Sequence, residues 1–340
     1  MSVIVDVHPS DPAYGTTLAS SLFGLMPTVD RPQWSVARLQ GVLGHAFQFE
    51  MKEDGGEVYH DNLDWGIAHR NIKKLAKFRA YQANKDKDID LPALKAEARD
   101  AALSSLQKGI TAVVWQPMSV EQKADGSHAY CWGLIVGYDE EEETYTIRHP
   151  FVKDQYTVRY DAIGHADPVE WFNVTVFDGH VDGDEKVIHL QAIEDAIRFA
   201  NGTRYSDANF LRENGKKVRP YGFAAYETWS KALDSDDVSV KFSSWHADML
   251  KTRRQLAGNY MSELADVFPE ASAALEAAAA EYNRELESLV PLHTLLVSAR
   301  ESETFTAEQR ADAQGLIGGA LNADRTAIAH VEAALAILKH

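Results

Sequence analysis

The chain has 340 residues, of which 45% are hydrophobic and 25% are charged, and its formal net charge is -17 at pH 7. This length can supply two hydrophobic cores, the composition is that of a globular protein, and the negative charge argues against a nucleic-acid partner. A single cysteine excludes an intrachain disulfide, and no apolar run approaches the roughly 20 residues that cross a membrane, so we expect a cytoplasmic protein with no membrane partner.

The first 180 residues are predicted to alternate helices with strands. After a short β-branched run and a loop with two prolines, apolar residues recur at helical spacing over residues 16–26. Residues 41–50 are predicted to form a turn that enters a strand. Further helices are predicted over residues 62–83 and 91–108, and further strands over residues 110–116, 156–160 and 170–177.

A β-hairpin is predicted over residues 131–149, CWGLIVGYDEEEETYTIRH. An apolar strand ends in a Gly-Tyr-Asp sequence, glutamates form the turn, and the returning strand places Tyr145 and Ile147 on one face. The hairpin begins at Cys131, the only cysteine in the chain.

A glycine- and aspartate-rich segment, residues 178–185, marks a boundary after which the pattern becomes helical. Thr306 and Gln309 fit a capping box, and Pro291 is expected to kink the helix in which it lies. Helices are predicted over residues 187–200, 222–233, 238–268, 270–303 and 306–338. Because long helices with short links pack antiparallel, we expect an α+β domain over residues 1–180 and an all-α helical-bundle domain over residues 185–340.

Sequence motifs of common catalysts and cofactor sites are absent: there is no His-Glu-x-x-His, no Cys-x-x-Cys, no dinucleotide-binding glycine motif and no Gly-x-Ser-x-Gly. His246, His293 and His330 lie on three different predicted helices. With a rise of ~1.5 Å per residue, His246 and His293 lie at nearly the same height along the bundle axis. His330 lies about 36 Å from the end of the bundle nearest to those two residues. We therefore expect no metal site and no cofactor.

Hydroxyl side chains gather where the first predicted helix begins, and N-capping explains them more simply than catalysis. The seven tryptophans are expected mainly as core and interface anchors. Several of them could still line one ligand pocket at the junction of the two domains, where small-molecule sites often form. The residues predicted to contribute to such a ligand site are Tyr14, Thr16, Thr17, Trp132, Tyr226, Trp229, Trp245 and His246.

Several segments resemble the papain-like cysteine peptidases in their bacterial leader-peptidase branch, and more specifically the acyltransferase-like family of the butirosin-biosynthesis protein BtrH. They are TTLASSLFGLM, GVLGHAFQF, WGLIVGYDEEEETYTIRHPF and VEWFNVTVF, with a weak extension over residues 222–229. The resemblance implies a papain-like fold for the first domain. In active members it implies a nucleophilic cysteine at the start of the N-terminal helix, a histidine that opens the Gly-Tyr-Asp strand, and an Asp or Asn on the returning strand.

This chain departs from the family pattern at all three positions. Residues 14–17 contain no cysteine, Cys131 stands at or next to the histidine position, and His149 stands at or near the third position. A remaining alternative pairs Cys131 with His149 as its base, because cross-strand neighbours in a hairpin have Cβ atoms ~5 Å apart. His128, just upstream, is a second candidate base.

Three hypotheses of function follow. The favoured one is a non-catalytic papain-like protein, a pseudoenzyme, that binds a small molecule or a peptide in a cleft between the two domains. The alternative from the enzyme class is a cysteine-dependent acyltransferase or amide hydrolase that uses Cys131 with His149. The third is a scaffold subunit that forms a homodimer through the helical bundle.

Overall fold

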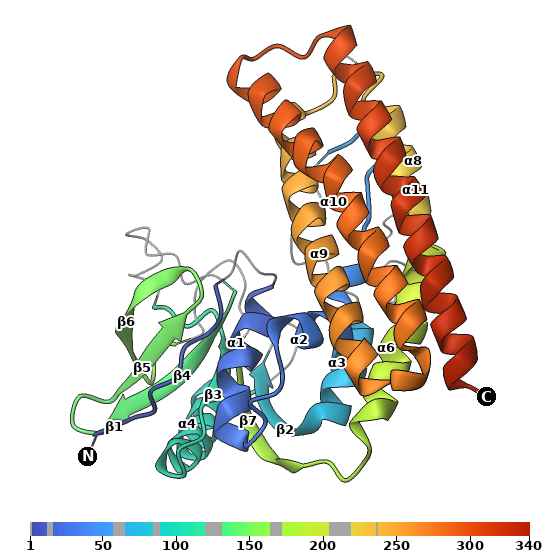
Figure 1. The fold of residues 1–340 in the computed structure, drawn as a ribbon. Helices are drawn as coiled ribbons and strands as arrows, with labels where there is room; N and C mark the ends of the chain where they lie inside the picture. The colour runs from blue at the N-terminus through green and yellow to red at the C-terminus, as the bar shows by residue number, and fades with distance from the viewer. Residues whose placement is uncertain are drawn as a thin grey trace. The chain divides into compact units, whose positions relative to one another are not determined.

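The computed structural model describes residues 2–11, 16–56, 65–83, 89–119, 131–163, 172–203, 219–235 and 237–340. The fold is mixed α+β, and the chain separates into two compact units (Figure 1). The first, called the sheet unit, consists of Met1–Leu39 and Lys73–Asp182. The second, called the helical unit, consists of Gln40–Ile72 and Gly183–His340.

Seven strands in the described part of the sheet unit form one antiparallel sheet. Six of them follow the order β2-β7-β3-β4-β5-β6, and β1 pairs with the C-terminal end of β4. The strands are β1 (Ser2–Ile4), β2 (Ala76–Ala83), β3 (Ala112–Trp115), β4 (Trp132–Asp139), β5 (Thr144–His149), β6 (Val152–Arg159) and β7 (Phe172–His180). The predicted hairpin is the β4–β5 pair, and its register places Tyr138 opposite Tyr145.

Helices α1 (Thr17–Leu25) and α4 (Leu91–Gln107) lie on opposite faces of this sheet. Successive residues of a strand point to opposite faces, so Leu134 and Ile135 of β4 identify which helix lies on which face. A Cβ added to Gly24 of α1 would lie 2.6 Å from Leu134 Cδ1. Ile135 instead belongs to the hydrophobic core that contains the buried alanines of α4. Strand β4 is therefore covered on both faces.

In the helical unit, three long helices pack side by side, with the middle one contacting both others (Figure 1). They are α9 (Val240–Val267), α10 (Ser272–Glu301) and α11 (Ala307–Leu338), and two shorter helices, α6 (Glu185–Ala200) and α8 (Phe223–Ala232), pack against α11. The predicted capping box at Thr306 and Gln309 is present. None of the helices within the described ranges combines the length and apolarity needed to cross a membrane.

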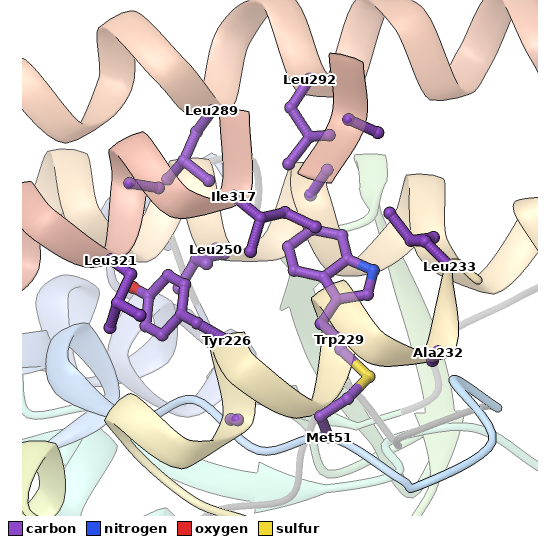
Figure 2. Packing of buried hydrophobic residues seen from close by; sticks show 14 of the residues in the cluster. Met51, Tyr226, Trp229, Ala232, Leu233, Leu250, Leu289, Leu292, Ile317 and Leu321 are labelled. Carbon is purple, nitrogen blue, oxygen red and sulfur yellow. The ribbon is translucent and has the colours of Figure 1, made fainter. Parts of the chain in front are cut away.

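Trp229 lies in the hydrophobic core of the helical unit and is fully buried. Figure 2 shows its indole ring among Leu292 of α10, Ile317 of α11 and Leu233, the residue that directly follows α8. Met51, from the segment that precedes α3 (Trp65–Leu75), belongs to the same core. Residues far apart in the sequence therefore share one core in this unit.

A buried polar cluster, called the Arg254 cluster, joins α8, α9, α10 and α11. It consists of Arg254, Glu285, Asp324 and Tyr226. Arg254 Nε lies 3.1 Å from Glu285 Oε2, its Nη2 lies 2.9 Å from Asp324 Oδ2, and its Nη1 donates a 2.9 Å hydrogen bond to the carbonyl oxygen of Ala46. Burial raises the pKa of the Glu285 carboxyl well above its usual range, against the opposing effect of Arg254.

Two predicted elements are wrong. The helix expected over residues 62–83 ends at Leu75, and Ala76–Ala83 forms strand β2, because pairing with β7 supplies its backbone hydrogen bonds. The strand expected within residues 41–50 is instead the end of α2 (Val36–Val42) and a 3-10 turn, His45–Phe47. The other predicted helices and strands are present within a few residues of their expected bounds.

Each of the two compact units consists of two separate segments of the sequence, so one boundary does not divide them. The change near residue 183 coincides with the expected boundary, but Gln40–Ile72 packs with the helical unit rather than with the rest of residues 1–180. Phe49 explains this in part, since its ring lies 4.8 Å from that of Tyr226 and 5.8 Å from that of Trp229, centroid to centroid. The segment thus contributes aromatic residues to the bundle core.

Candidate functional site

The candidate site lies in the sheet unit, where α1 begins beside the start of β4. Thr16 caps α1, and its hydroxyl oxygen accepts a 3.4 Å hydrogen bond from the backbone N–H of Ala19. The next residue, Thr17, is buried, and its Oγ1 accepts a 3.2 Å hydrogen bond from the backbone N–H of Trp132. The first turn of α1 is therefore attached directly to β4 through a threonine hydroxyl.

Two residues with positive φ lie beside this attachment. Gln116 follows β3 with φ 45°, and Cys131 precedes β4 with φ 77°. The backbone N–H of Gln116 donates a 2.7 Å hydrogen bond to the carbonyl oxygen of Cys131. Side chains with a Cβ rarely adopt this conformation, and such strain costs about 1–3 kcal/mol per residue and concentrates at functional sites.

The side chain of Gln116 is fully buried, and neither its Nε2 nor its Oε1 has a hydrogen-bond partner within the described residues. The hydroxyls of Ser20 and Ser21, on the first turns of α1, are also buried without partners in that part of the chain. Buried polar groups in folded proteins are usually paired, and leaving one unpaired costs about 1–3 kcal/mol. Within the described residues, this end of the sheet thus holds polar atoms that packing does not satisfy.

His149 ends strand β5 and is 2% exposed. A Cβ added to Gly133 would lie 3.0 Å from His149 Cδ2, so the imidazole ring lies directly against the backbone of β4. His149 Nδ1 accepts a 3.2 Å hydrogen bond from the backbone N–H of Phe151. Because an accepting ring nitrogen carries no proton, Nε2 is the protonated position of the neutral ring.

A pocket of about 350 Å³ opens beside His149 within the sheet unit. It is called the His149 pocket. Its lining comes from two stretches, His8, Pro9, Ser10 and Asp11 on one side and Arg148, His149, Pro150, Phe151, Val152 and Lys153 on the other. Ser10 Oγ is shielded from solvent without a hydrogen-bond partner in the described residues, whereas Phe151 is 60% exposed. The pocket therefore combines basic side chains with one unsatisfied hydroxyl and an exposed aromatic ring.

The structure brings several of the predicted site residues to this end of the sheet. Thr16, Thr17 and Trp132 lie at the contact between α1 and β4, and Cys131 directly precedes Trp132. His149 lies on the neighbouring strand, against Gly133. Cys131 is 8% exposed. Two predicted site residues, Tyr14 and His128, lie outside the described residues.

The other predicted ligand residues belong to the helical unit. Tyr226 is fully buried, and its hydroxyl donates a 2.6 Å hydrogen bond to Glu285 Oε1. Trp229 Nε1 donates a 3.4 Å hydrogen bond to the hydroxyl of Ser243, and its ring is enclosed by the core. The surroundings of both side chains are those of packing residues.

Trp245 and His246, on α9, differ in exposure. Trp245 is half-buried, and the Nζ atom of Lys241 lies 4.8 Å from the centroid of its ring. His246 is buried, and its Nε2 lies 3.2 Å from the carbonyl oxygen of Gly56. Within the described residues no three His, Cys, Asp or Glu side chains are grouped so as to hold a metal ion.

The chemistry available at the start of α1 differs from that of a cysteine peptidase. Thr16 and Thr17 stand where the resemblance implies a nucleophilic cysteine, and the Thr17 hydroxyl oxygen already accepts a backbone hydrogen bond. A threonine hydroxyl becomes a nucleophile only when a base removes its proton. Cys131 and His149 stand at or near the other two positions that the resemblance implies. The arrangement suits ligand contact through hydrogen bonds better than acyl transfer.

Sequence reasoning missed two residues of this region. Gln116 carries no motif, and its strain and unpaired amide depend on the packing of β3 against β4 and α1. Ser10 lies in a proline-containing loop whose sequence does not indicate a pocket.

No protein-family model matches the chain, and a search of curated proteins finds no significant match.

Proposed function

We propose that the sheet unit is a papain-like domain that has lost its peptidase nucleophile and binds a small molecule or a peptide in the His149 pocket. The observation that carries this proposal is the start of α1, where residues 14–17 contain no cysteine and the Thr17 hydroxyl oxygen accepts a hydrogen bond from the Trp132 backbone. Ser10 lines the His149 pocket, and its hydroxyl has no hydrogen-bond partner among the described residues, which supports a polar contact at this place.

The lining of the pocket favours a ligand with a carboxylate and an apolar group. His8, Arg148 and Lys153 contribute basic side chains, and Asp11 is the acidic residue in the lining. Asp6, next to the lining, pairs with Arg148 at 3.0 Å and lies 3.8 Å from His8, so Lys153 is the side chain that would attract a carboxylate. The exposed ring of Phe151 offers an apolar surface at the same opening. A volume near 350 Å³ falls at the small end of the range for ligand pockets, which suits one or two residues of a peptide or a compact organic acid.

Saturation-transfer NMR tests the proposal with two probe sets, N-acetylated tripeptides with free carboxyl ends and small aromatic carboxylic acids. We expect at least one probe to bind the native protein and to remain intact by mass spectrometry. The substitution Phe151→Glu should weaken that binding at least fivefold, because it removes the aromatic surface and adds a negative charge. Binding that is unchanged in Phe151→Glu, or the absence of binding by every probe, contradicts the proposal.

Val187→Glu is a matched control for that substitution. Val187 is 55% exposed, compared with 60% for Phe151, but it lies on α6 in the helical unit. Both variants replace an exposed apolar side chain with a carboxylate and should leave the fold intact, since surface substitutions usually change stability by about 0.5 kcal/mol or less. Only Phe151→Glu should affect binding.

A second candidate function is acyl transfer through Cys131, with His149 as the base. The strained backbone of Cys131 and the position of His149 on the adjacent strand favour it. It requires an accessible thiolate. It also requires His149 Nδ1 to give up its hydrogen bond from the Phe151 N–H, or the ring to take the other tautomer, because a base needs an unprotonated and unengaged nitrogen. Rapid labelling of the native protein by iodoacetamide, lost in Cys131→Ser and slowed in His149→Gln, would support this function. Labelling only after denaturation would exclude it.

A further inference from the structure

A second cavity of the sheet unit lies between α4 and the β5–β6 region. It has a volume of about 280 Å³ and is called the Lys95 pocket. Its lining residues are Leu91, Pro92, Lys95, Ala96, Arg99, Glu143, Arg159, Tyr160 and Asp161. It shares no residue with the lining of the His149 pocket, so it is a separate site.

Three cationic side chains meet in this pocket, although the chain as a whole has a formal charge of -17. Lys95 and Arg99 are four residues apart on α4, which places both on one face of the helix. Arg159 reaches the same space from the end of β6. Two acidic residues, Glu143 and Asp161, also line the pocket, and Arg159 pairs with both, at 3.7 Å and 3.1 Å. Arg99 in turn pairs with Asp100 at 2.7 Å. Both arginines are therefore ion-paired, and Lys95 is the cation of the pocket for which the described residues place no carboxylate oxygen within ion-pair distance.

Among the three cations of the pocket, Lys95 has the least of its positive charge neutralised by neighbouring carboxylates. Its Nζ donates a hydrogen bond to the backbone carbonyl oxygen of Asp161, and the residue is half-buried. Burial lowers the pKa of Lys95 to about 8, and the attraction of the Asp161 carboxylate opposes this only in part. An anion placed beside the ammonium group would stabilise its charged form.

The rest of the pocket wall is apolar and fixed. Leu91, Pro92 and Ala96 come from the first turns of α4. The ring of Tyr160 packs on that of Tyr145 with a centroid distance of 4.6 Å. The Tyr160 hydroxyl donates a 3.1 Å hydrogen bond to the carbonyl oxygen of Asp139, which holds the ring in place. One side of the pocket thus attracts negative charge and the other accepts an apolar surface.

We propose that the Lys95 pocket binds a small molecule that has a single phosphate or carboxylate group and an apolar body. The anionic group lies among Lys95, Arg99 and Arg159, and the apolar body lies against the first turns of α4 and the Tyr160 ring. Asp100 and Asp161 already accept hydrogen bonds from Arg99 and Arg159, so the Lys95 ammonium group and the remaining guanidinium N–H groups are the donors for phosphate or carboxylate oxygens.

The test uses phenyl phosphate, benzoate, inorganic phosphate and benzyl alcohol as probes, with binding followed by protection of Lys95 from acetylation by acetic anhydride at pH 8. We expect phenyl phosphate or benzoate to slow acetylation of Lys95 at least fivefold at saturation, while other lysines react at unchanged rates. Inorganic phosphate should bind at least threefold more weakly than phenyl phosphate, because it lacks the apolar body. Benzyl alcohol should not protect. Equal protection of all lysines, or equal affinity for the two phosphates, overturns the proposal.

Arg159→Gln and Arg79→Gln form a matched pair for the same measurement. Both arginines are exposed to a similar degree, 57% and 59%, and each pairs with an aspartate at 3.1–3.2 Å, but Arg79 lies on β2 at the other edge of the sheet. Arg159→Gln should weaken phenyl phosphate binding at least fivefold, and Arg79→Gln should not change it. Equal effects of the two substitutions contradict the proposal.

The pH dependence of phenyl phosphate binding provides an independent readout. Lys95 loses its proton as the pH rises through about 8, so the affinity should fall between pH 7 and pH 9.5. The fall should be smaller in Lys95→Met, which binds more weakly at pH 7. The Arg residues stay charged over this range, and Tyr160 does not titrate within it, because burial raises its pKa to about 12. An affinity that is constant with pH in the native protein rules out a contact with Lys95.

Discussion

The Arg254 cluster of the helical unit and the end of the sheet near Gln116 both bury polar groups, but they satisfy them differently. The contrast is between these two places, since the Tyr282 hydroxyl in the helical unit also lacks a hydrogen-bond partner among the described residues. In the Arg254 cluster, each nitrogen of the guanidinium group faces an acceptor, supplied by Glu285, Asp324, Tyr226 or a backbone carbonyl. At the end of the sheet, the Gln116 amide has no hydrogen-bond partner in the described part of the chain, and its backbone has a positive φ.

This difference separates a structural cluster from a candidate site. A paired buried charge fixes the packing of the helices around it, and removing one partner leaves the others uncompensated. Strain and unpaired polar atoms in one place have no such structural benefit, and they concentrate at functional sites. The positive φ of Gln116 and Cys131 beside the unpaired Gln116 amide therefore favours a candidate site at this end of the sheet. Removing a partner from the Arg254 cluster should cost stability, whereas relieving the strain at Gln116 should increase it.

Arg254→Met should give the largest effect. It leaves Glu285 and Asp324 in the core without their cation, at a cost of about 3–5 kcal/mol in the free energy of unfolding. Arg325→Met is the control, because Arg325 pairs with Glu227 at 2.8 Å on the surface of the same unit, and exposed pairs contribute about 1 kcal/mol or less. Denaturant unfolding measures both. Similar losses in the two variants would mean that the Arg254 cluster is not the structural element described.

Gly133→Ala should disturb the candidate site. The added Cβ would lie 3.0 Å from His149 Cδ2 and 2.9 Å from Pro117 Cγ, so the imidazole has to move, at a cost of about 1–3 kcal/mol. In Gly183→Ala the added Cβ meets nothing within 4 Å, and we expect a change of about 0.5 kcal/mol or less. Unfolding experiments and the NMR signals of the His149 ring report the two effects. An unshifted His149 signal in Gly133→Ala contradicts the packing described.

Gln116→Gly should stabilise the protein relative to Gln116→Ala. Glycine adopts a φ of 45° without strain, whereas alanine keeps the strained conformation, and we expect a difference of about 1 kcal/mol in favour of glycine. Both variants remove the side-chain amide, so the difference between their free energies of unfolding reports the strain of the backbone at residue 116. The test is a comparison of their midpoints in denaturant, and a less stable glycine variant would show that this residue is not strained.

His45, in the helical unit, should give a small pH effect. Its Nδ1 lies 3.1 Å from Gln40 Oε1, and burial, assisted by Arg253, lowers its pKa well below the usual value. As the pH falls below about 6.5, the unfolded chain gains a proton at this residue while the folded chain does not, so stability is lost. Between pH 6.5 and 5.5 the native protein should lose about 1 kcal/mol more than His45→Gln. Equal losses in the two proteins would show that His45 is protonated when folded.

Local pattern predicted most of the elements, since amphipathic spacing and β-branched runs located the long helices and the β4–β5 hairpin. It failed where tertiary contacts decided the structure. Ala76–Ala83 continues a helical charge pattern but pairs with β7, and Gln40–Ile72 joins a core whose other members lie more than a hundred residues later. The positive φ of Gln116 depends on how β3 meets β4, which no single segment encodes.

The central claim is that the end of the sheet near His149 binds a ligand without cleaving it. The most direct test labels the histidines with ¹⁵N and titrates the protein with the tripeptide or carboxylic acid that binds in saturation-transfer NMR. We expect the ring signals of His149 to shift saturably, those of buried His45 and His189 to stay constant, and the probe to remain intact. Shifts confined to other histidines, or turnover of the probe, would contradict the claim.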